Sequence, residues 1–159
     1  TLNLIKAYLL CKSRSDFKLV ITGKVEAAHE PEVRSFINRN DLKSDIIITK
    51  YLPDEALKAL FVNAKAFLFP TLYEGFGIPI LESMAAGIPV LTSTTGAAPE
   101  TAGDFAVLVD PLAPESIATG IDQLIGIDTK HLEKAKTFAL GHTWSKTAQM
   151  TALVYKKYV

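Results

Sequence analysis

The stretch PTLYEGFGIPILESMAAGIPVL, residues 70–91, decides the fold of this chain. An apolar run at 66–69 leads into it and predicts a short buried strand. A helical pattern follows over 78–86, with Pro79 near its first turn and Gly87 just past its end, which is the asymmetry typical of helix termini. The stretch ends in another apolar run and therefore predicts a strand, a glycine-rich loop, a helix and a second strand.

Short apolar runs alternate with helical patterns on both sides of this stretch. Strands that are apolar on both faces and alternate with helices indicate a parallel sheet covered by helices on two sides. The 159 residues suffice for one domain, so the predicted fold class is α/β, with a Rossmann-like parallel sheet in a single domain over 1–159. Strands are expected at 17–22, 45–49, 66–69, 90–92 and 105–109, and helices at 2–13, from 31, at 53–63, 78–86, 114–125 and 129–139, and from 143 to the end.

Composition excludes several classes of function. Basic and acidic residues both number 17, so no net charge attracts nucleic acid. No stretch reaches the ~20 apolar residues that a membrane span needs. Cys11 has no cysteine to pair with, the histidines are scattered, and no metal site is expected. A lone cysteine, read as a buried helix thiol, favours the cytoplasm, and the chain is expected to begin partway through a larger protein.

The loop after the 66–69 strand has the features of a phosphate site. Gly75 and Gly77 leave backbone amides uncovered just before a helix begins, where unpaired N–H groups carry partial positive charge. Glu74 precedes the turn and Glu82 lies a little over one turn inside the helix, so their carboxylates can bind sugar and ribose hydroxyls. An alternative stays open at this point, because the glycines could only shape a turn and Glu82 could be an ordinary solvated residue.

The same segment closely resembles the hallmark of the family-four retaining glycosyltransferases. In that family two glutamates separated by seven residues enclose Gly-Phe-Gly, and the motif E-(S/A)-M-A-x-G-x-P-V follows. Here the match runs from Glu74 through Gly75-Phe76-Gly77 to Glu82-Ser83-Met84-Ala85-Ala86-Gly87-Ile88-Pro89-Val90. The flanking segments DFKLVITGK, YLPDEALKALFVNAKAFLFP, GAAPETAGDFAVLVDP and HTWSKTAQMTALVYKKY are similar to the family in order and spacing.

The resemblance implies a role for each matching residue. Glu74, the residue implied for catalysis, would contact hydroxyls of the donor sugar, and Glu82 would hold the ribose. The remaining donor-binding residues implied are Gly23 and Lys24 beside the phosphates, Tyr51 and Leu52 beside the base, and the amides of Gly75, Phe76, Gly77 and Ile78. Lys50 departs from the glycine that is common in the family, so the turn at the base is expected to differ in shape or donor preference.

The resemblance implies the carboxy-terminal half of a GT-B enzyme. Such a hexosyltransferase moves a sugar from a UDP-sugar or GDP-sugar to a glycan or lipid-linked acceptor with retention of configuration, without a metal or other cofactor. The acceptor domain and a basic phosphate clamp would lie upstream of residue 1, so this part alone is expected to be inactive. Polysaccharide or glycolipid synthesis is the expected process, with peripheral membrane association of the whole protein left open. A non-catalytic nucleotide-sugar-binding module of the same fold is the alternative.

Two further expectations concern residues outside the motif. Ser93, Thr94 and Thr95 precede Gly96 in a loop, where their hydroxyls are expected to satisfy turn amides. Trp144 is expected to anchor in the core.

Overall fold

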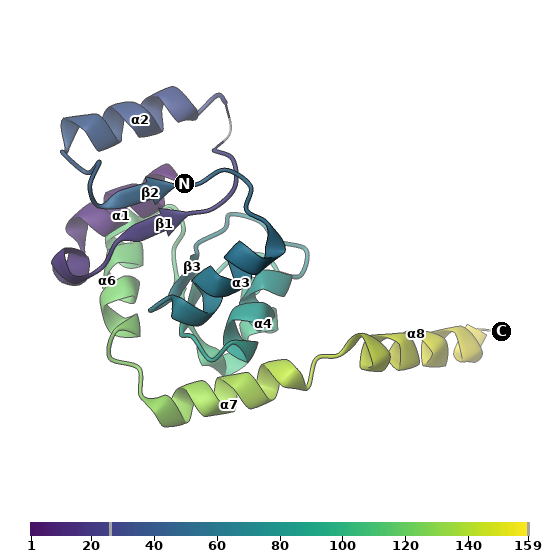
Figure 1. Cartoon of the computed structure of the whole chain (residues 1–159). Helices are drawn as coiled ribbons and strands as arrows, with labels where there is room; N and C mark the ends of the chain where they lie inside the picture. The colour runs from purple at the N-terminus through teal and green to yellow at the C-terminus, as the bar shows by residue number, and fades with distance from the viewer. Residues whose placement is uncertain (26, 159) are drawn as a thin grey trace.

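A computed structural model describes residues 1–25 and 27–158 and shows short parallel strands surrounded by helices (Figure 1). Each expected strand is present, and its ends lie within two residues of the predicted ones. The strands are β1 (Leu19–Ile21), β2 (Ile46–Ile48), β3 (Phe67–Phe69), β4 (Val90–Ser93) and β5 (Ala106–Val109). All pairings among them are parallel, so the predicted α/β class is confirmed.

The strands form two separate ladders, whereas the sequence predicts one sheet. β1 pairs with β2, and β3, β4 and β5 pair in that order. Val20 lies opposite Ile47 in the first ladder, and Leu91 lies opposite both Leu68 and Val107 in the second. No described strand pairs with the second edge of β1 or of β3. An apolar pattern shows that a segment is extended, but it does not show which segment becomes its neighbour.

The predicted helices are all present, together with one that the sequence pattern missed. α5 has only five residues, too few to display a helical repeat. The first helix ends earlier than expected, because Cys11 is extended (ψ 139°) and a 3₁₀ turn at Lys12–Asp16 follows. The helices are α1 (Leu2–Leu10), α2 (Glu30–Arg39), α3 (Asp54–Asn63), α4 (Ile78–Ala85), α5 (Ala98–Ala102), α6 (Pro114–Leu124), α7 (Thr129–Leu140) and α8 (Trp144–Tyr158).

Three apolar clusters hold these elements together. One joins α1 and α6 to the second ladder through Ile117, Leu124 and the fully buried Leu91. Another packs α1 and α2 on the first ladder, and a third packs α4, α5 and α7 around Val90. Cys11 is buried in the first cluster as predicted, but it lies just past the end of α1 and not within a helix. Burial raises the pKa of its thiol to about 12, which leaves it unreactive at neutral pH.

The final helix stands apart from these clusters. α8 extends away from the rest of the chain in Figure 1, and its described residues are all exposed. Trp144 is 78% exposed, so the prediction that it anchors in the core is wrong. The sequence pattern shows on which face of α8 Trp144 lies, but it does not show whether that face contacts the rest of the chain. Among the described residues, no helix is long and apolar enough to cross a bilayer.

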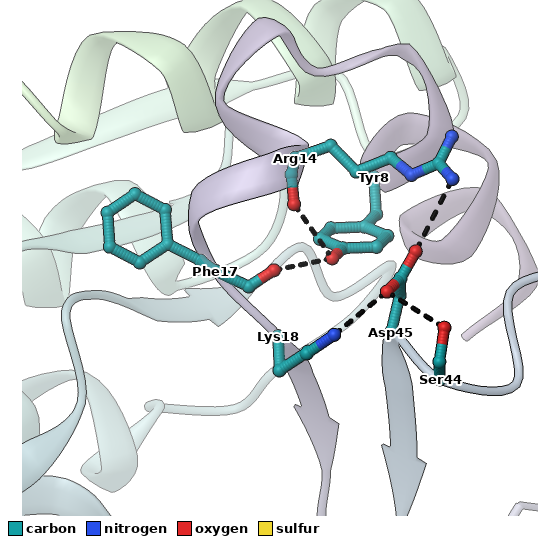
Figure 2. Close-up of polar contacts among 6 residues, drawn as sticks. All are labelled: Tyr8, Arg14, Phe17, Lys18, Ser44 and Asp45. Atoms are coloured by element: carbon teal, nitrogen blue, oxygen red, sulfur yellow. Dashed lines mark hydrogen bonds and ion pairs between the residues drawn. The ribbon is translucent and has the colours of Figure 1, made fainter.

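A carboxylate joins the beginnings of β1 and β2 (Figure 2). Asp45 accepts hydrogen bonds from Lys18 Nζ at 2.9 Å and from an Arg14 guanidinium nitrogen at 3.3 Å. Tyr8 of α1 donates from its hydroxyl to the carbonyl of Phe17 at 2.5 Å, so α1 is tied to the same corner. The hydrogen bond from Lys18 lowers the pKa of the Asp45 carboxyl from its ordinary value, and Arg14 acts in the same direction.

Asp45 therefore gives the fold a pH dependence with a defined sign. Because its pKa is lowered in the folded chain, its stabilising effect is present above the ordinary aspartate pKa of about 3.9 and is lost as the pH falls through the lowered value. We expect Asp45→Asn to lower the melting temperature at pH 7 and to lower it by less at pH 3, as measured by circular dichroism.

The matched control is Glu55→Gln, which breaks the exposed ion pair between Glu55 and Lys58. Exposed pairs contribute little to stability, so this control should leave the melting temperature nearly unchanged at both pH values. An equal difference between Asp45→Asn and the original chain at pH 3 and pH 7 would contradict the assigned role of Asp45.

Candidate functional site

The glycine-rich turn lies between β3 and α4, as the sequence predicts. Gly77 stands at the N-cap of α4 with a left-handed φ of 92°, and Pro79 lies in the first turn of that helix. Only glycine adopts this φ without strain, which explains the residue at this position. Ile80, Ser83 and Met84 bury the inner face of α4 and thereby fix where its first turn lies.

The two glutamates of the motif both lack partners within the protein. Glu74 is half-buried in the turn, and Glu82 is exposed on α4. Among the described residues, neither carboxylate takes part in a hydrogen bond or ion pair. A carboxylate with no internal partner retains its full capacity to accept hydrogen bonds from a ligand's hydroxyl groups.

The loop after β4 supports the turn from one side. Gly96 has a φ of 64°, and a Cβ atom added to it would lie 3.2 Å from both the backbone nitrogen and the carbonyl oxygen of Glu74. The backbone N–H of Ala97 donates to the Glu74 carbonyl at 3.2 Å. Glu74 is therefore positioned by direct backbone contact with the β4–α5 loop.

Hydroxyl groups from the end of β4 and from the same loop also reach the turn. Ser93 donates to the carbonyl of Thr71 at 2.5 Å, and Thr95 donates to the carbonyl of Leu72 at 3.2 Å. The prediction that the hydroxyls of this loop satisfy turn amides is wrong, because each of them donates to a backbone carbonyl. Sequence reasoning missed Thr101, whose hydroxyl donates to the carbonyl of Phe76. It lies in α5, the helix too short to give a periodic signal.

The residues expected beside the phosphates and the base lie at the ends of the first ladder. Gly23 and Lys24 follow β1, while Tyr51 and Leu52 follow β2. The backbone N–H of Thr49 donates to the carbonyl of Ile21 at 2.9 Å, which brings the two loops together. Lys24 is exposed, and Tyr51 is 83% exposed.

These loops and the Glu74 turn form two groups. Among the described residues, no hydrogen bond or ion pair joins Gly23, Lys24, Tyr51 or Leu52 to the residues from Glu74 to Glu82. Both groups nevertheless follow the carboxyl ends of parallel strands, where ligands bind in open α/β sheets.

Two surface hollows lie away from the predicted site. One of about 360 Å³ is lined by residues of β5 and α6, and one of about 250 Å³ lies near Asp104 and Gly126. None of the predicted donor-binding residues lines either hollow. Within the described part of the chain, no three His, Cys, Asp or Glu side chains gather as metal ligands.

The sequence matches known proteins along most of its length. The family described as glycosyl transferases group 1 matches residues 2–139. The chain is 31% identical over 162 residues to O-antigen chain mannosyltransferase B of Escherichia coli, covering 96% of this chain and 41% of that protein. It is 30% identical over 142 residues to a GDP-mannose-dependent α-(1-6)-phosphatidylinositol dimannoside mannosyltransferase of Mycobacterium tuberculosis, covering 87% of this chain and 35% of that protein.

Solved structures agree with the fold class. An Anabaena protein, HepE, in complex with UDP-glucose has a TM-score of 0.83 at 20% identity, covering 99% of this chain and 44% of that chain. At this identity the likeness shows the shared GT-B type of fold. The chain thus spans less than half the length of each of these three proteins.

The contact between Gly96 and Glu74 predicts a difference between two glycines. Gly96→Ala and Gly87→Ala both place a side chain at positive φ, which costs about 1–2 kcal/mol. A Cβ at position 87 meets no atom within 4 Å, whereas one at position 96 presses on the backbone of Glu74. We therefore expect Gly96→Ala to lower the free energy of unfolding by roughly 1 kcal/mol more than Gly87→Ala in urea titrations. Equal losses would show that the loop does not press on the turn.

Proposed function

The chain belongs to the glycosyl transferases group 1 family, and we propose that it is the donor-binding part of a retaining hexosyltransferase of family four. The strongest support is one observation. The turn from Glu74 to Gly77 leads into α4 with its amides at the start of that helix, and the carboxylates of Glu74 in the turn and of Glu82 in α4 have no partner among the described residues. These are the groups that a sugar linked to a diphosphate requires.

The proposed donor is a nucleoside diphosphate hexose, with GDP-mannose favoured. Support comes from relatives whose names specify mannosyl transfer and, in one case, dependence on GDP-mannose. UDP-hexoses are the second class of donor, supported by the neighbour that binds UDP-glucose. In this proposal the carboxylate of Glu82 accepts hydrogen bonds from ribose hydroxyls, and that of Glu74 accepts them from the hexose. Lys24 lies beside the phosphates, and Tyr51 and Leu52 lie beside the base.

The proposed chemistry depends on stabilising a departing diphosphate. As the bond from the anomeric carbon to the phosphate oxygen breaks, negative charge grows on that oxygen, and fixed N–H groups at the start of α4 stabilise it. The leaving phosphate takes the proton of the incoming acceptor hydroxyl, which attacks from the same face and so retains configuration. Glu74 orients the hexose and forms no covalent bond. We propose that these N–H groups serve in place of a divalent metal ion.

The proposed acceptor is a glycan or a lipid-linked sugar. Relatives are named for an O-antigen chain and for phosphatidylinositol dimannoside, which supports this class. Because the chain spans only 35–41% of these relatives, the acceptor is assigned to a further part of the whole protein.

The proposal predicts that Glu82 contributes to donor binding. Glu82→Ala removes a charged acceptor whose hydrogen bonds are worth about 1.5–3 kcal/mol. The dissociation constant for GDP-mannose, or for UDP-glucose if that donor binds more tightly, should therefore rise roughly tenfold or more, as measured by titration calorimetry with this chain.

Glu133→Ala is the matched control, since Glu133 is likewise an exposed helical glutamate but lies on α7. It should leave the dissociation constant unchanged. Micromolar binding that is indifferent to Glu82→Ala would overturn the assignment of the site. Donor binding in the whole protein without any sugar transfer would favour a non-catalytic module.

A further inference from the structure

In the turn between β3 and α4, most backbone carbonyls accept hydrogen bonds, whereas the backbone amides from Leu72 onward donate none. Ala97, Thr101 and the hydroxyls of the β4–α5 loop supply most of the donors. The carbonyls that accept are those of Thr71, Leu72, Tyr73, Glu74, Phe76 and Gly77. In the described chain, no backbone N–H from Leu72 to Ile78 donates a hydrogen bond.

The direction of each bonded carbonyl determines the direction of the N–H that follows it in the chain. All described peptide bonds are trans, and in a trans peptide the C=O and the following N–H point in opposite directions. The carbonyl of Glu74 is held by Ala97, so the N–H of Gly75 points away from the β4–α5 loop. The carbonyl of Phe76 is held by Thr101, so the N–H of Gly77 points away from α5.

The N–H of Gly77 is unusual among these amides. Gly77 is buried, yet its N–H has no hydrogen-bond partner in the described chain. Native proteins pair more than about 90% of their buried backbone N–H groups, because an unpaired one costs free energy. Thr101 holds the carbonyl of this peptide, and the unpaired N–H on the opposite side is well suited to donate to a ligand oxygen.

We infer that Thr101 is a positioning residue for the donor. It is 5% exposed, so it touches no ligand itself, and its hydroxyl fixes the peptide between Phe76 and Gly77. Through that peptide it directs the Gly77 N–H at the diphosphate or the hexose. This inference rests on the proposed function and adds to it a residue outside the motif.

The test uses the ¹⁵N-labelled chain titrated with GDP-mannose and with UDP-glucose. In the original chain, the better of these donors should shift the amide resonances of Gly75 and Gly77. Thr101→Val keeps the shape of the side chain and removes the hydroxyl. It should abolish the Gly77 shift and raise the dissociation constant about tenfold, whereas resonances around Glu82 still shift. Thr101→Ser, which keeps the hydroxyl, should restore both values.

Thr92→Val is the matched control. Thr92 is also a buried threonine whose hydroxyl donates to a carbonyl, that of Phe69 at 3.0 Å, which belongs to β3 and not to the turn. It should leave the Gly77 shift and the dissociation constant unchanged. A general loosening of the fold would instead weaken donor binding in both valine variants and reduce the shifts around Glu82, and this result would overturn the inference.

The outcomes separate the two proposals. If Thr101→Val keeps the Gly77 shift and binds within twofold of the original chain, the inference fails and the proposed function stands. If neither donor shifts any amide from Leu72 to Ile78 in the original chain, both fail. If Thr101→Val does not fold, hydrogen exchange of the original chain decides, since bound donor must slow exchange at Gly75 and Gly77 at least tenfold. No slowing would overturn the inference.

Discussion

The hydrogen bonds between the β4–α5 loop and the carbonyls of the turn after β3 are the constraint on which the site depends. They use most of the carbonyl acceptors of the turn, and its N–H donors from Leu72 onward have no partners in the described chain. The arrangement needs Gly96, because any side chain there would press on Glu74. It also needs Thr101, because the Phe76 carbonyl accepts a hydrogen bond from no other described donor. In our proposal this segment binds the diphosphate through its amides, without a basic side chain of its own.

The fold supports this constraint by holding two helices against one short ladder. Ile80 and Met84 bury α4, and Ala98 and Ala102 bury α5, in the same apolar cluster around Val90. α4, which follows the turn, and α5, which carries Thr101, are thus packed together, and a shift of one helix must disturb the other. The first ladder, which carries Gly23 and Tyr51, packs in a different cluster. The parts of the predicted site therefore rest on separate portions of the core.

The sequence was sufficient to predict the strands, the longer helices and the glycine turn, because each follows from apolar periodicity or from proline and glycine at helix ends. It did not predict the separation into two ladders, since pairing depends on contacts between distant segments. It missed α5 and with it Thr101, because five residues show no repeat. The prediction of a buried Trp144 is wrong, because a helical pattern of apolar residues is the same whether or not another part of the chain packs against that face.

A crystal structure of the chain with GDP-mannose or UDP-glucose tests the central claim most directly. The account predicts the backbone nitrogens of Gly75 and Gly77 at about 3 Å from oxygens of the phosphates or the hexose, with the carboxylate of Glu82 on the ribose. A donor seated instead in the hollow between β5 and α6, or one that leaves both glycine amides without contact, would contradict it.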